Sequence, residues 1–346
     1  MSDINYTKRI DSLKARYNPE NTRLFESRVF SETLGLSGDT SKYVRMAMMA
    51  VDDDYTRKSK QAGEMAKEHL KKELTNVDFE YQGSVMTDTH IKGASDIDLL
   101  VLCTKFNHTE INKVRSELKK ADNYTYTERQ NLQLYEKHFS LYEGNCNADL
   151  RQLRSEIERV MMATYKICDT SKPKSVKITN QSLHRDVDVV TACWYDTFYY
   201  VLHGEQKIDR AISIYDKEKD ADKGPDYPFL SIDRINSRSA YTNGRLKRMI
   251  RFLKNVRTDS DRMIDLSSFE INAICYNIST SEYINSEYKQ LVYLLWNFMY
   301  HLHKDGTASQ LRSVVGDEKV FTSTQKIESL KNLEDEVWNI YQDLSK

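Results

Sequence analysis

Two carboxylates set within an apolar run are the feature that most limits how this chain can fold. Asp96 and Asp98 stand two positions apart, and the residues between and after them are apolar: Ile97, Leu99, Leu100 and Val101. Because side chains alternate faces along a strand, both carboxylates project to one side, roughly 7 Å apart, while the alternate residues Ile97, Leu99 and Val101 face a core. Two charges on an otherwise buried strand are costly unless a cation lies between them. The run therefore predicts a strand that carries a cation site.

A Gly-Ser pair lies at the end of the preceding apolar run. Phe79 to Val85 is predicted to be a strand that leads into Gly83 and Ser84, and Ser95 to Cys103 is predicted to be the next strand. Glycine lets a phosphate approach the backbone closely, and serine adds a hydroxyl donor. Together with the backbone N–H groups, these features suit the binding of a phosphate. A plain turn is the alternative interpretation of this pair.

A second pair of alternating carboxylates lies farther along the chain. Asp186 and Asp188 share one face of a predicted strand that runs from Asp186 to Trp194. Mg²⁺ prefers oxygen ligands, and three carboxylates on adjacent strands can hold two such ions roughly 4 Å apart. Asp96 and Asp98 would bind both ions, and a carboxylate of the second strand would bind the ion beside the nucleophile. The residues by themselves leave Asp186 and Asp188 both open for that role.

The remaining periodicity changes along the chain. Apolar residues spaced by three or four predict one long amphipathic helix from Ser41 to about Leu74, which we expect to act as a spine. Residues 124–147 lack a clear period and are predicted to be irregular, whereas Thr197 to Tyr215 is predicted to continue the sheet. The charged Gly-Pro stretch from Asp216 to Asp226 favours a domain boundary.

Beyond that stretch the pattern is helical. The expected domains are residues 1–226, a catalytic lobe with the sheet and the spine helix, and residues 227–346, a helical lobe. In the second domain a basic helix with an apolar stripe includes Lys254, and Ser267 and Ser268 can cap the helix that follows. The sequence thus predicts an α+β fold in which a mixed-sheet lobe is joined to a helical lobe.

The cysteines and the charge exclude several classes of protein. The five cysteines are scattered and form no Cys-x-x-Cys pair, which favours a reducing compartment and argues against a structural zinc site. There is no apolar run of the roughly 18 residues that a membrane span needs, and the charged N-terminus is unlike a signal peptide. A formal net charge of −1 gives no overall attraction to a nucleic-acid backbone. We expect a soluble, cytoplasmic protein in which phosphate binding is local.

The spacing of the Gly-Ser pair, the Asp-x-Asp run and a later Asp-Val-Val run resembles the DNA polymerase β-like nucleotidyltransferase superfamily. In that superfamily the third carboxylate is followed by two apolar residues, as Asp188 is followed by Val189 and Val190. The resemblance therefore implies Asp188 rather than Asp186 as the third metal ligand. Thr191 stands where the superfamily commonly has proline, a departure that alters the end of the strand more than metal ligation.

Softer motifs are similar to those of the cyclic GMP-AMP synthase/DncV-like group, the CD-NTases of bacterial CBASS anti-phage systems. These motifs are Thr89 ahead of the Asp-x-Asp run, the basic helix with Lys254, and Ser268 followed by phenylalanine. The resemblance implies that Lys254 and Ser268, together with Gly83 and Ser84, bind the triphosphate of the donor nucleotide. It also implies a two-lobed polymerase β-like fold with nucleotides held between the lobes.

The same resemblance implies that the protein is a Mg²⁺-dependent nucleotidyltransferase. It would join nucleoside triphosphates, ATP among them, into a cyclic di- or oligonucleotide second messenger and release pyrophosphate. Two Mg²⁺ ions would be the cofactor, with Mn²⁺ as a substitute, and an effector protein would respond to the product. We expect no membrane partner and no direct binding of DNA, because the chain shows neither the inserted Cys/His zinc element nor the strongly basic surface of the animal DNA-sensing relative.

Two other functions stay open. One is a transferase that adds a nucleotide to a tRNA, a protein or a small molecule without cyclising it. The other is a catalytically silent binding module that kept the fold. The intact carboxylates Asp96, Asp98 and Asp188 argue against the silent module.

Overall fold

The computed structural model describes residues 4–16, 33, 36, 38–91, 93, 96–120 and 123–346. The chain forms two compact units, each of which is described by itself below. Unit 1 comprises residues 1–56, 87–95 and 234–346, and unit 2 comprises residues 57–86 and 96–233. The strand start predicted at Ser95 lies outside the described residues, and the division into domains at residue 226 stays a prediction.

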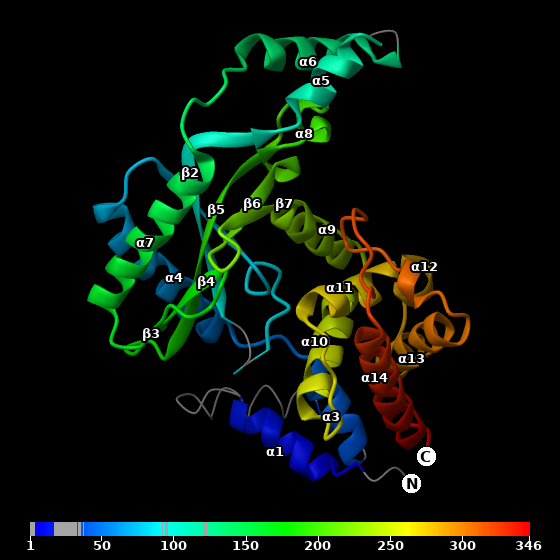
Figure 1. The fold of residues 1–346 in the computed structure, drawn as a ribbon. Helices are drawn as coiled ribbons and strands as arrows, with labels where there is room; N and C mark the ends of the chain where they lie inside the picture. Colours follow the sequence, from blue (N-terminus) through cyan, green and yellow to red (C-terminus); the bar gives the residue numbers. More distant parts are fainter. Residues whose placement is uncertain are drawn as a thin grey trace. The chain divides into compact units, whose positions relative to one another are not determined.

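A mixed sheet of seven strands organises unit 2 (Figure 1). Its main path is β1-β2-β5-β4-β3; β4 pairs with the first half of β5, and β6 pairs with the second half. β2 and β5 run parallel, and the other pairs are antiparallel. The strands are β1 (Val77–Gln82), β2 (Ile97–Thr109), β3 (Cys168–Asp169), β4 (Ser175–Asn180), β5 (Arg185–Asp196), β6 (Ala211–Asp216) and β7 (Ala221–Asp226).

Two helices cover one face of this sheet. α4 (Asp53–Glu73) and α7 (Cys146–Thr164) lie along it in Figure 1, and their apolar residues share a core with the sheet. The alternation predicted for β2 is confirmed, because Ile97, Leu99 and Val101 all belong to this core. The opposite face of the same strands therefore carries the residues of the other parity.

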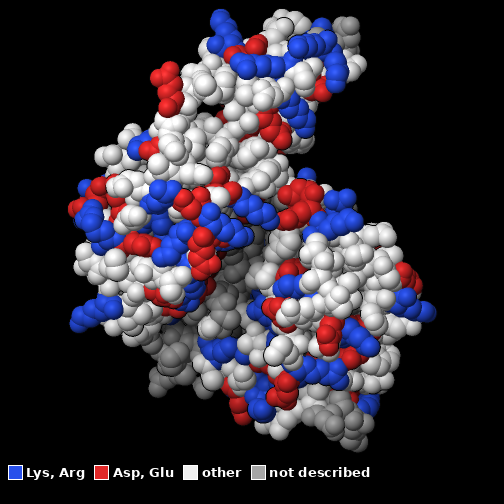
Figure 2. Space-filling model, in the orientation of Figure 1, with Lys and Arg blue, Asp and Glu red and all other residues white. Residues whose placement is uncertain are grey.

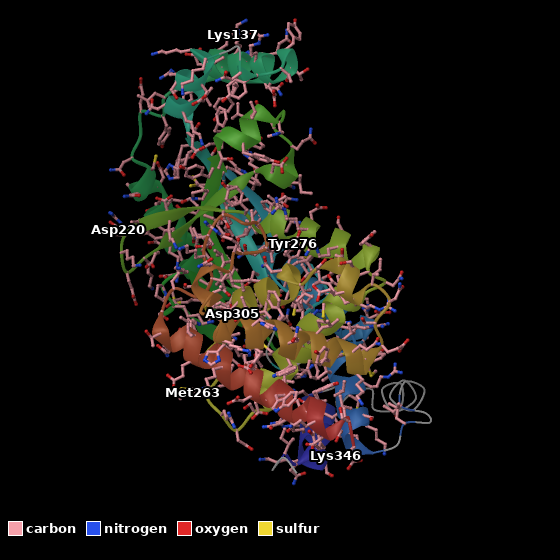
Figure 3. The ribbon with its side chains drawn as sticks, turned by 90° about the vertical axis from the view of Figure 1, so that its right-hand side faces the viewer. Lys137, Asp220, Met263, Tyr276, Asp305 and Lys346 are labelled. Carbon is pink, nitrogen blue, oxygen red and sulfur yellow. The ribbon has the colours of Figure 1, made fainter. Side chains whose placement is uncertain are left out.

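Three short helices pack together near the end of β2 around a small apolar cluster of their own: α5 (Ile111–Leu118), α6 (Tyr126–His138) and α8 (Phe198–Leu202). Lys137 marks α6 in Figure 3. The prediction that residues 124–147 are irregular is wrong, because α6 occupies much of that segment. Its signal is a capping box, in which Thr125 and Glu128 each accept a hydrogen bond from the other's backbone N–H. All residues of α6 are described, and Leu132 is the only one of them that is buried. The helix therefore has no apolar stripe by which the sequence could predict it.

The segment after β5 is only partly sheet. α8 and a 3-10 turn (Lys207–Asp209) precede β6, so the prediction of sheet for Thr197 to Tyr215 is right only at its end. The charged stretch predicted as a boundary, Asp216–Asp226, forms the turn and second strand of a hairpin, in which β7 pairs with β6. Asp220, labelled in Figure 3, takes a positive φ of 47° in the hairpin turn.

The predicted spine helix is broken. α3 (Asp39–Met48) and α4 are separate helices, so the prediction of one helix from Ser41 to Leu74 is wrong. Met49 takes an extended conformation, and Asp52 Oδ1 accepts a hydrogen bond of 2.7 Å from the backbone N–H of Tyr55, which starts a new helix. Val51 in the break is itself buried, so the apolar spacing continues across it and hides the interruption.

Unit 1 has a helical core arranged around α10, whose residues from Met249 to Val256 are all buried. The predicted cap is confirmed, because Ser267 and Glu270 form a capping box at the start of α11. Figure 3 labels Tyr276 in α11 and Lys346 at the end of the chain, after α14. The helices of the unit, of which α9 begins in unit 2, are α1 (Tyr6–Arg16), α3, α9 (Pro228–Tyr241), α10 (Arg245–Asp259), α11 (Ser268–Asn277), α12 (Thr280–Tyr283), α13 (Tyr288–Lys304) and α14 (Thr324–Asp343).

The surface carries both signs of charge. Figure 2 shows Lys and Arg side chains interspersed with Asp and Glu on the visible face of each unit, in keeping with the net charge of −1. Among the described residues, no helix combines the length and the apolar character that crossing a bilayer requires.

Candidate active site

The parallel pairing of β2 and β5 places carboxylates side by side. Asp98 of β2 is directly opposite Asp188 of β5, and Asp96 immediately precedes β2. Their neighbours of the same parity, Leu100 and Val190, belong to the small core on the face opposite α4 and α7. The carboxylates therefore project from the face that those two helices leave uncovered, at the ends where β2 and β5 begin.

The turn after β1 lies against Asp98. Gln82, the last residue of β1, is the register partner of Asp98, and Gly83 follows it with a φ of +86°. A Cβ at position 83 would overlap Asp98 Oδ2. Only glycine combines this left-handed backbone with so close an approach. The predicted Gly-Ser turn is thus beside the carboxylates, and it carries Ser84, which is half-buried.

The electrostatics of the carboxylates reflect their burial and their mutual repulsion. Burial, reinforced by the charges of Asp188 and Asp96, raises the pKa of Asp98 to about 7. The pKa of Asp96 is also raised, mainly by burial, although Lys177 opposes the shift. An ionised Asp98 is therefore unfavourable at this position unless a cation neutralises it.

Strand β4 supplies partners to these carboxylates that the sequence did not single out. Lys177 Nζ lies 2.6 Å from Asp96 Oδ2 and 3.0 Å from Asp186 Oδ2. Ser175 Oγ donates a 3.0 Å hydrogen bond to Asp188 Oδ1. The signal is the polar alternation of β4, whose residues Ser175, Lys177 and Thr179 share one face with apolar residues between them. A second lysine, Lys172, lies 3.2 Å from Asp188 Oδ1.

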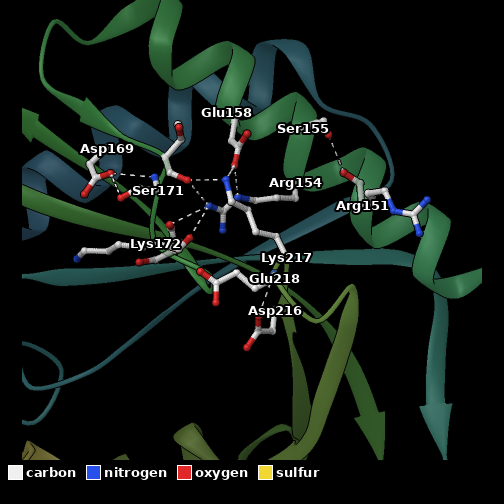
Figure 4. Close-up of polar contacts among 12 residues, drawn as sticks. Arg151, Arg154, Ser155, Glu158, Asp169, Ser171, Lys172, Asp216, Lys217 and Glu218 are labelled. Atoms are coloured by element: carbon white, nitrogen blue, oxygen red, sulfur yellow. Dashed lines mark hydrogen bonds and ion pairs between the residues drawn. The ribbon is translucent and has the colours of Figure 1, made fainter.

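The segment between β3 and β4, which carries Lys172, is anchored by a buried arginine (Figure 4). Arg154 of α7 is only 2% exposed and donates hydrogen bonds to the backbone oxygens of Thr170, Lys172 and Ser175. Glu158 pairs with Arg154 at 2.8 Å, and so neutralises the buried guanidinium. This network fixes the segment that brings Lys172 and Ser175 to Asp188.

Asp186 and Asp188 share a face, as predicted, but their partners differ. Thr179 Oγ1 donates a 2.6 Å hydrogen bond to Asp186 Oδ1, and Lys177 contacts its other oxygen. Asp186 is one pleat farther from Asp98 along β5 than Asp188 is. The register thus favours Asp188 as the third ligand, although that assignment stays a prediction.

The two remaining predicted residues, Lys254 and Ser268, lie in unit 1. Lys254 is 1% exposed, and its Nζ donates a 3.0 Å hydrogen bond to the backbone oxygen of Thr89. Burial, with Arg257 and Arg251 nearby, lowers the pKa of Lys254 to about 7. Ser268 is the first residue of α11 and is partly exposed, next to the capping residue Ser267. In this structure Lys254 therefore holds the segment around Thr89, while Ser268 is accessible.

Comparison with known proteins identifies the family. Residues 233–342 match the family model described as the cGAS/DncV-like nucleotidyltransferase C-terminal helical domain. Over 346 residues the chain is 56% identical to a c-di-GMP synthase of Lachnospiraceae bacterium (strain RUG226), and the match covers 100% of both chains. The chain belongs to the cGAS/DncV-like nucleotidyltransferases.

Solved structures of this family agree with the fold. The STING-associated CdnE c-di-GMP synthase from Capnocytophaga granulosa is 40% identical, with a TM-score of 0.81 and 99% of each chain covered. A STING-associated CdnE c-di-GMP synthase from Flavobacteriaceae sp. is 34% identical, with a TM-score of 0.85 and the same coverage of 99%. The predicted family, the two-lobed α+β fold and the enzyme class, a nucleotidyltransferase that makes cyclic nucleotides, are confirmed.

Catalysis in the cGAS/DncV-like family generally depends on divalent metal ions, and the residues of unit 2 fit such an ion. The donors offered by Asp96, Asp98 and Asp188 are all carboxylate oxygens, which hard cations such as Mg²⁺ prefer. The raised pKa of Asp98 and the lysine on Asp96 both indicate a place that favours positive charge. The number and identity of the ions, and the roles of the individual residues, are proposals below.

Proposed function

We propose that this chain joins two molecules of GTP into c-di-GMP, forming two phosphodiester bonds and releasing two pyrophosphates. The choice of GTP follows the relatives, which are c-di-GMP synthases at 56% and 42% identity over nearly the whole chain. The observation that carries the reaction itself is the register of β2 and β5, which sets Asp98 beside Asp188 and next to the Gly83 turn.

The proposed ligands are Asp96, Asp98 and Asp188, which would hold two Mg²⁺, or Mn²⁺ in their place. Such ions supply charge neutralisation for the triphosphate and acidify the attacking ribose hydroxyl. The protein's own part is positional. Asp98 lies against the Gly83 turn, and Asp188 accepts a hydrogen bond from Ser175, so the packing of the protein limits where their oxygens can lie before substrate arrives.

Four further residues are proposed to bind the donor triphosphate. Gly83 and Ser84 offer backbone N–H groups and a hydroxyl in a turn beside Asp98. Ser268 stands at the N-terminus of α11, where the helix dipole favours an anion, and its side chain is partly exposed. Lys254 would have to exchange its bond to Thr89 for a phosphate oxygen, so we expect its contribution to depend on movement of that segment.

The proposed setting is anti-phage signalling in the bacterial cytoplasm, where nucleoside triphosphates are abundant. Two related structures are described as STING-associated c-di-GMP synthases, which supports an effector protein that recognises the cyclic product. Residues 1–226 would form the catalytic domain and residues 227–346 the helical domain.

The test is product analysis with the purified full chain. Incubation with each labelled nucleoside triphosphate and Mg²⁺, followed by phosphatase treatment, should leave a resistant product from GTP alone, with the mass of c-di-GMP. A transferase that modifies tRNA, protein or a small molecule would instead give no resistant product without its acceptor. A product that required ATP or a pyrimidine nucleotide would overturn the proposed base choice and keep the reaction class.

A further inference from the structure

A second cluster of metal-ligand side chains lies in unit 2, away from the carboxylates described above. It consists of His108 of β2, Cys193 of β5 and Asp222 of β7, whose ligand atoms all lie within 4.8 Å of one another. Cys193 is fully buried, and the other two are partly buried. The three residues come from three strands that are far apart in the sequence, so no local sequence motif predicts the cluster.

The folding of the sheet brings these residues together. In hydrogen-bonding order β5 and β6 separate β2 from β7, which corresponds to roughly 14 Å in a flat sheet. Nevertheless His108 Nε2 lies only 2.7 Å from Asp222 Oδ2, so the sheet curls around Cys193. Gly224 permits this close approach of β7, because a Cβ there would lie 2.6 Å from Ser213 Oγ and 3.1 Å from the Tyr195 ring.

The contacts within the cluster orient the donor atoms. Burial raises the pKa of the Cys193 thiol, and the hydrogen bond from the backbone N–H of His108 to its sulfur opposes that shift only in part. The Ser213 side chain hydrogen-bonds to Asp222. His108 Nε2 is buried and contacts Asp222 Oδ2, but the two groups are not aligned for a regular hydrogen bond. Nitrogen, oxygen and sulfur atoms that converge so closely form a ligand set that one cation can share.

We propose that His108, Cys193 and Asp222 bind a zinc ion, with the fourth position left to water. Zinc prefers sulfur and nitrogen donors, whereas Mg²⁺ prefers an all-oxygen set. The bond lengths to zinc, about 2.0–2.3 Å, place the ligand atoms of a tetrahedral site roughly 3.3–3.8 Å apart. His108 Nε2 and Asp222 Oδ2 are 2.7 Å apart, and all three ligand atoms lie within 4.8 Å of one another, so small side-chain movements would bring them to those values.

The residues around the cluster indicate how an ion would reach it and what the ion would do. A pocket of about 1150 Å³ in unit 2 is lined by His108, Asn107 and Cys146 and opens toward solvent. The ion would connect β7, most of whose residues are exposed, to the two central strands. Its role is therefore structural, fixing the β6–β7 hairpin. Cys193 belongs to the core shared with α4 and α7, on the face opposite the carboxylates.

Metal analysis of the purified full chain tests the proposal. Protein prepared without chelator should carry close to one zinc per chain, and protein reconstituted with Co²⁺ should show the charge-transfer absorption of a thiolate ligand. Cys193→Ala and Asp222→Asn should each lower the zinc content at least about tenfold. The matched control is Cys275→Ala, which removes another fully buried thiol, in α11 of unit 1, and should leave the zinc content unchanged.

Two results would overturn the proposal. Wild-type protein that holds neither zinc nor cobalt above background would mean that His108 and Asp222 are only an ion pair beside an inert thiol, and would overturn the proposal. Cys193→Ala protein that keeps its full metal content would overturn it too. Because the wild-type metal content and cobalt spectrum need no variant, a poorly folding variant does not leave the question open. Removal of zinc should also lower the melting temperature of the wild type more than that of Cys193→Ala.

Discussion

The parallel strands β2 and β5 carry two clusters of polar residues that are proposed to bind metal ions, one near each end and on opposite faces of the sheet. At the start of the strands, Asp98 and Asp188 offer only oxygen atoms, and lysines contact the carboxylates around them. Toward the other end, His108 and Cys193 offer nitrogen and sulfur, and one carboxylate from β7 joins them. The same pair of strands therefore carries hard oxygen donors and softer nitrogen and sulfur donors at different positions and on different faces.

The two clusters also differ in how they handle charge. Burial and neighbouring carboxylates raise the pKa of Asp98, so its ionised form depends on an external cation. Burial acts on Asp222 as well, but the adjacent His108 and a hydrogen bond from Ser213 outweigh it and lower the pKa of Asp222. The acidic cluster therefore carries a cost in stability, which the proposed binding of cations would offset, whereas the second cluster is consistent with a structural role.

The largest effect expected is the loss of activity in Asp98→Asn. Removing a proposed ligand should lower pyrophosphate release and c-di-GMP formation by at least about 100-fold, since changes even behind the ligands cost roughly 10- to 100-fold. Asp186→Asn should cost less than Asp188→Asn, and Cys193→Ala should stay within about threefold of wild type, as a structural site would. Equal losses in Asp186→Asn and Asp188→Asn would contradict the assigned third ligand.

The same Asp98→Asn variant should gain stability when divalent cations are absent. The native pKa of about 7 is above the unfolded value, so between about pH 4 and pH 7 the native state binds more protons, and stability falls as the pH rises. At pH 8 in chelator the variant should be more stable by on the order of 2–4 kcal/mol, and this advantage should shrink as the pH approaches 4. Urea unfolding at several pH values measures it, and equal stabilities at pH 8 would refute the burial argument.

Two glycines allow the clusters to be perturbed separately. Gly83→Ala forces a side chain into a positive φ and against Asp98, and should lower activity about tenfold to 100-fold while zinc content is unchanged. Gly224→Ala crowds Ser213 and should lower zinc content while activity changes by less than about threefold. Assays of turnover and metal content on both variants compare the clusters directly. If Gly224→Ala behaved like Gly83→Ala, the two clusters would not be independent.

A smaller effect is expected from Lys177→Met. Because Lys177 occupies an oxygen of Asp96, its removal should strengthen Mn²⁺ binding by about threefold to tenfold, the worth of a partly exposed ion pair. Titration followed by the paramagnetism of Mn²⁺ measures the affinity without any turnover. Lys174→Met is the matched control, since Lys174 is an exposed lysine just before the same strand. Weaker Mn²⁺ binding in Lys177→Met would indicate that Lys177 organises the site rather than competes for it.

The elements that the sequence predicts well are those with a local signal. The alternation in β2 and the capping box of Ser267 and Glu270 depend on a few neighbouring residues, and both are confirmed. The failures have local causes as well. The break between α3 and α4 is hidden by buried Val51, and α6 lacks an apolar stripe because it packs on a small peripheral cluster.

By itself the sequence determined the strand with two carboxylates, the glycine turn before it and the family to which they point, because side-chain alternation and backbone freedom are properties of adjacent residues. Only the tertiary structure decided that Asp188 lies opposite Asp98, that Lys177 pairs with Asp96, and that Lys254 is buried against Thr89. Those contacts join segments far apart in the chain, so they depend on strand register and on the packing of helices and loops, which no local pattern fixes. The meeting of His108, Cys193 and Asp222 is of the same kind, and for that reason the scattered cysteines gave no sign of it.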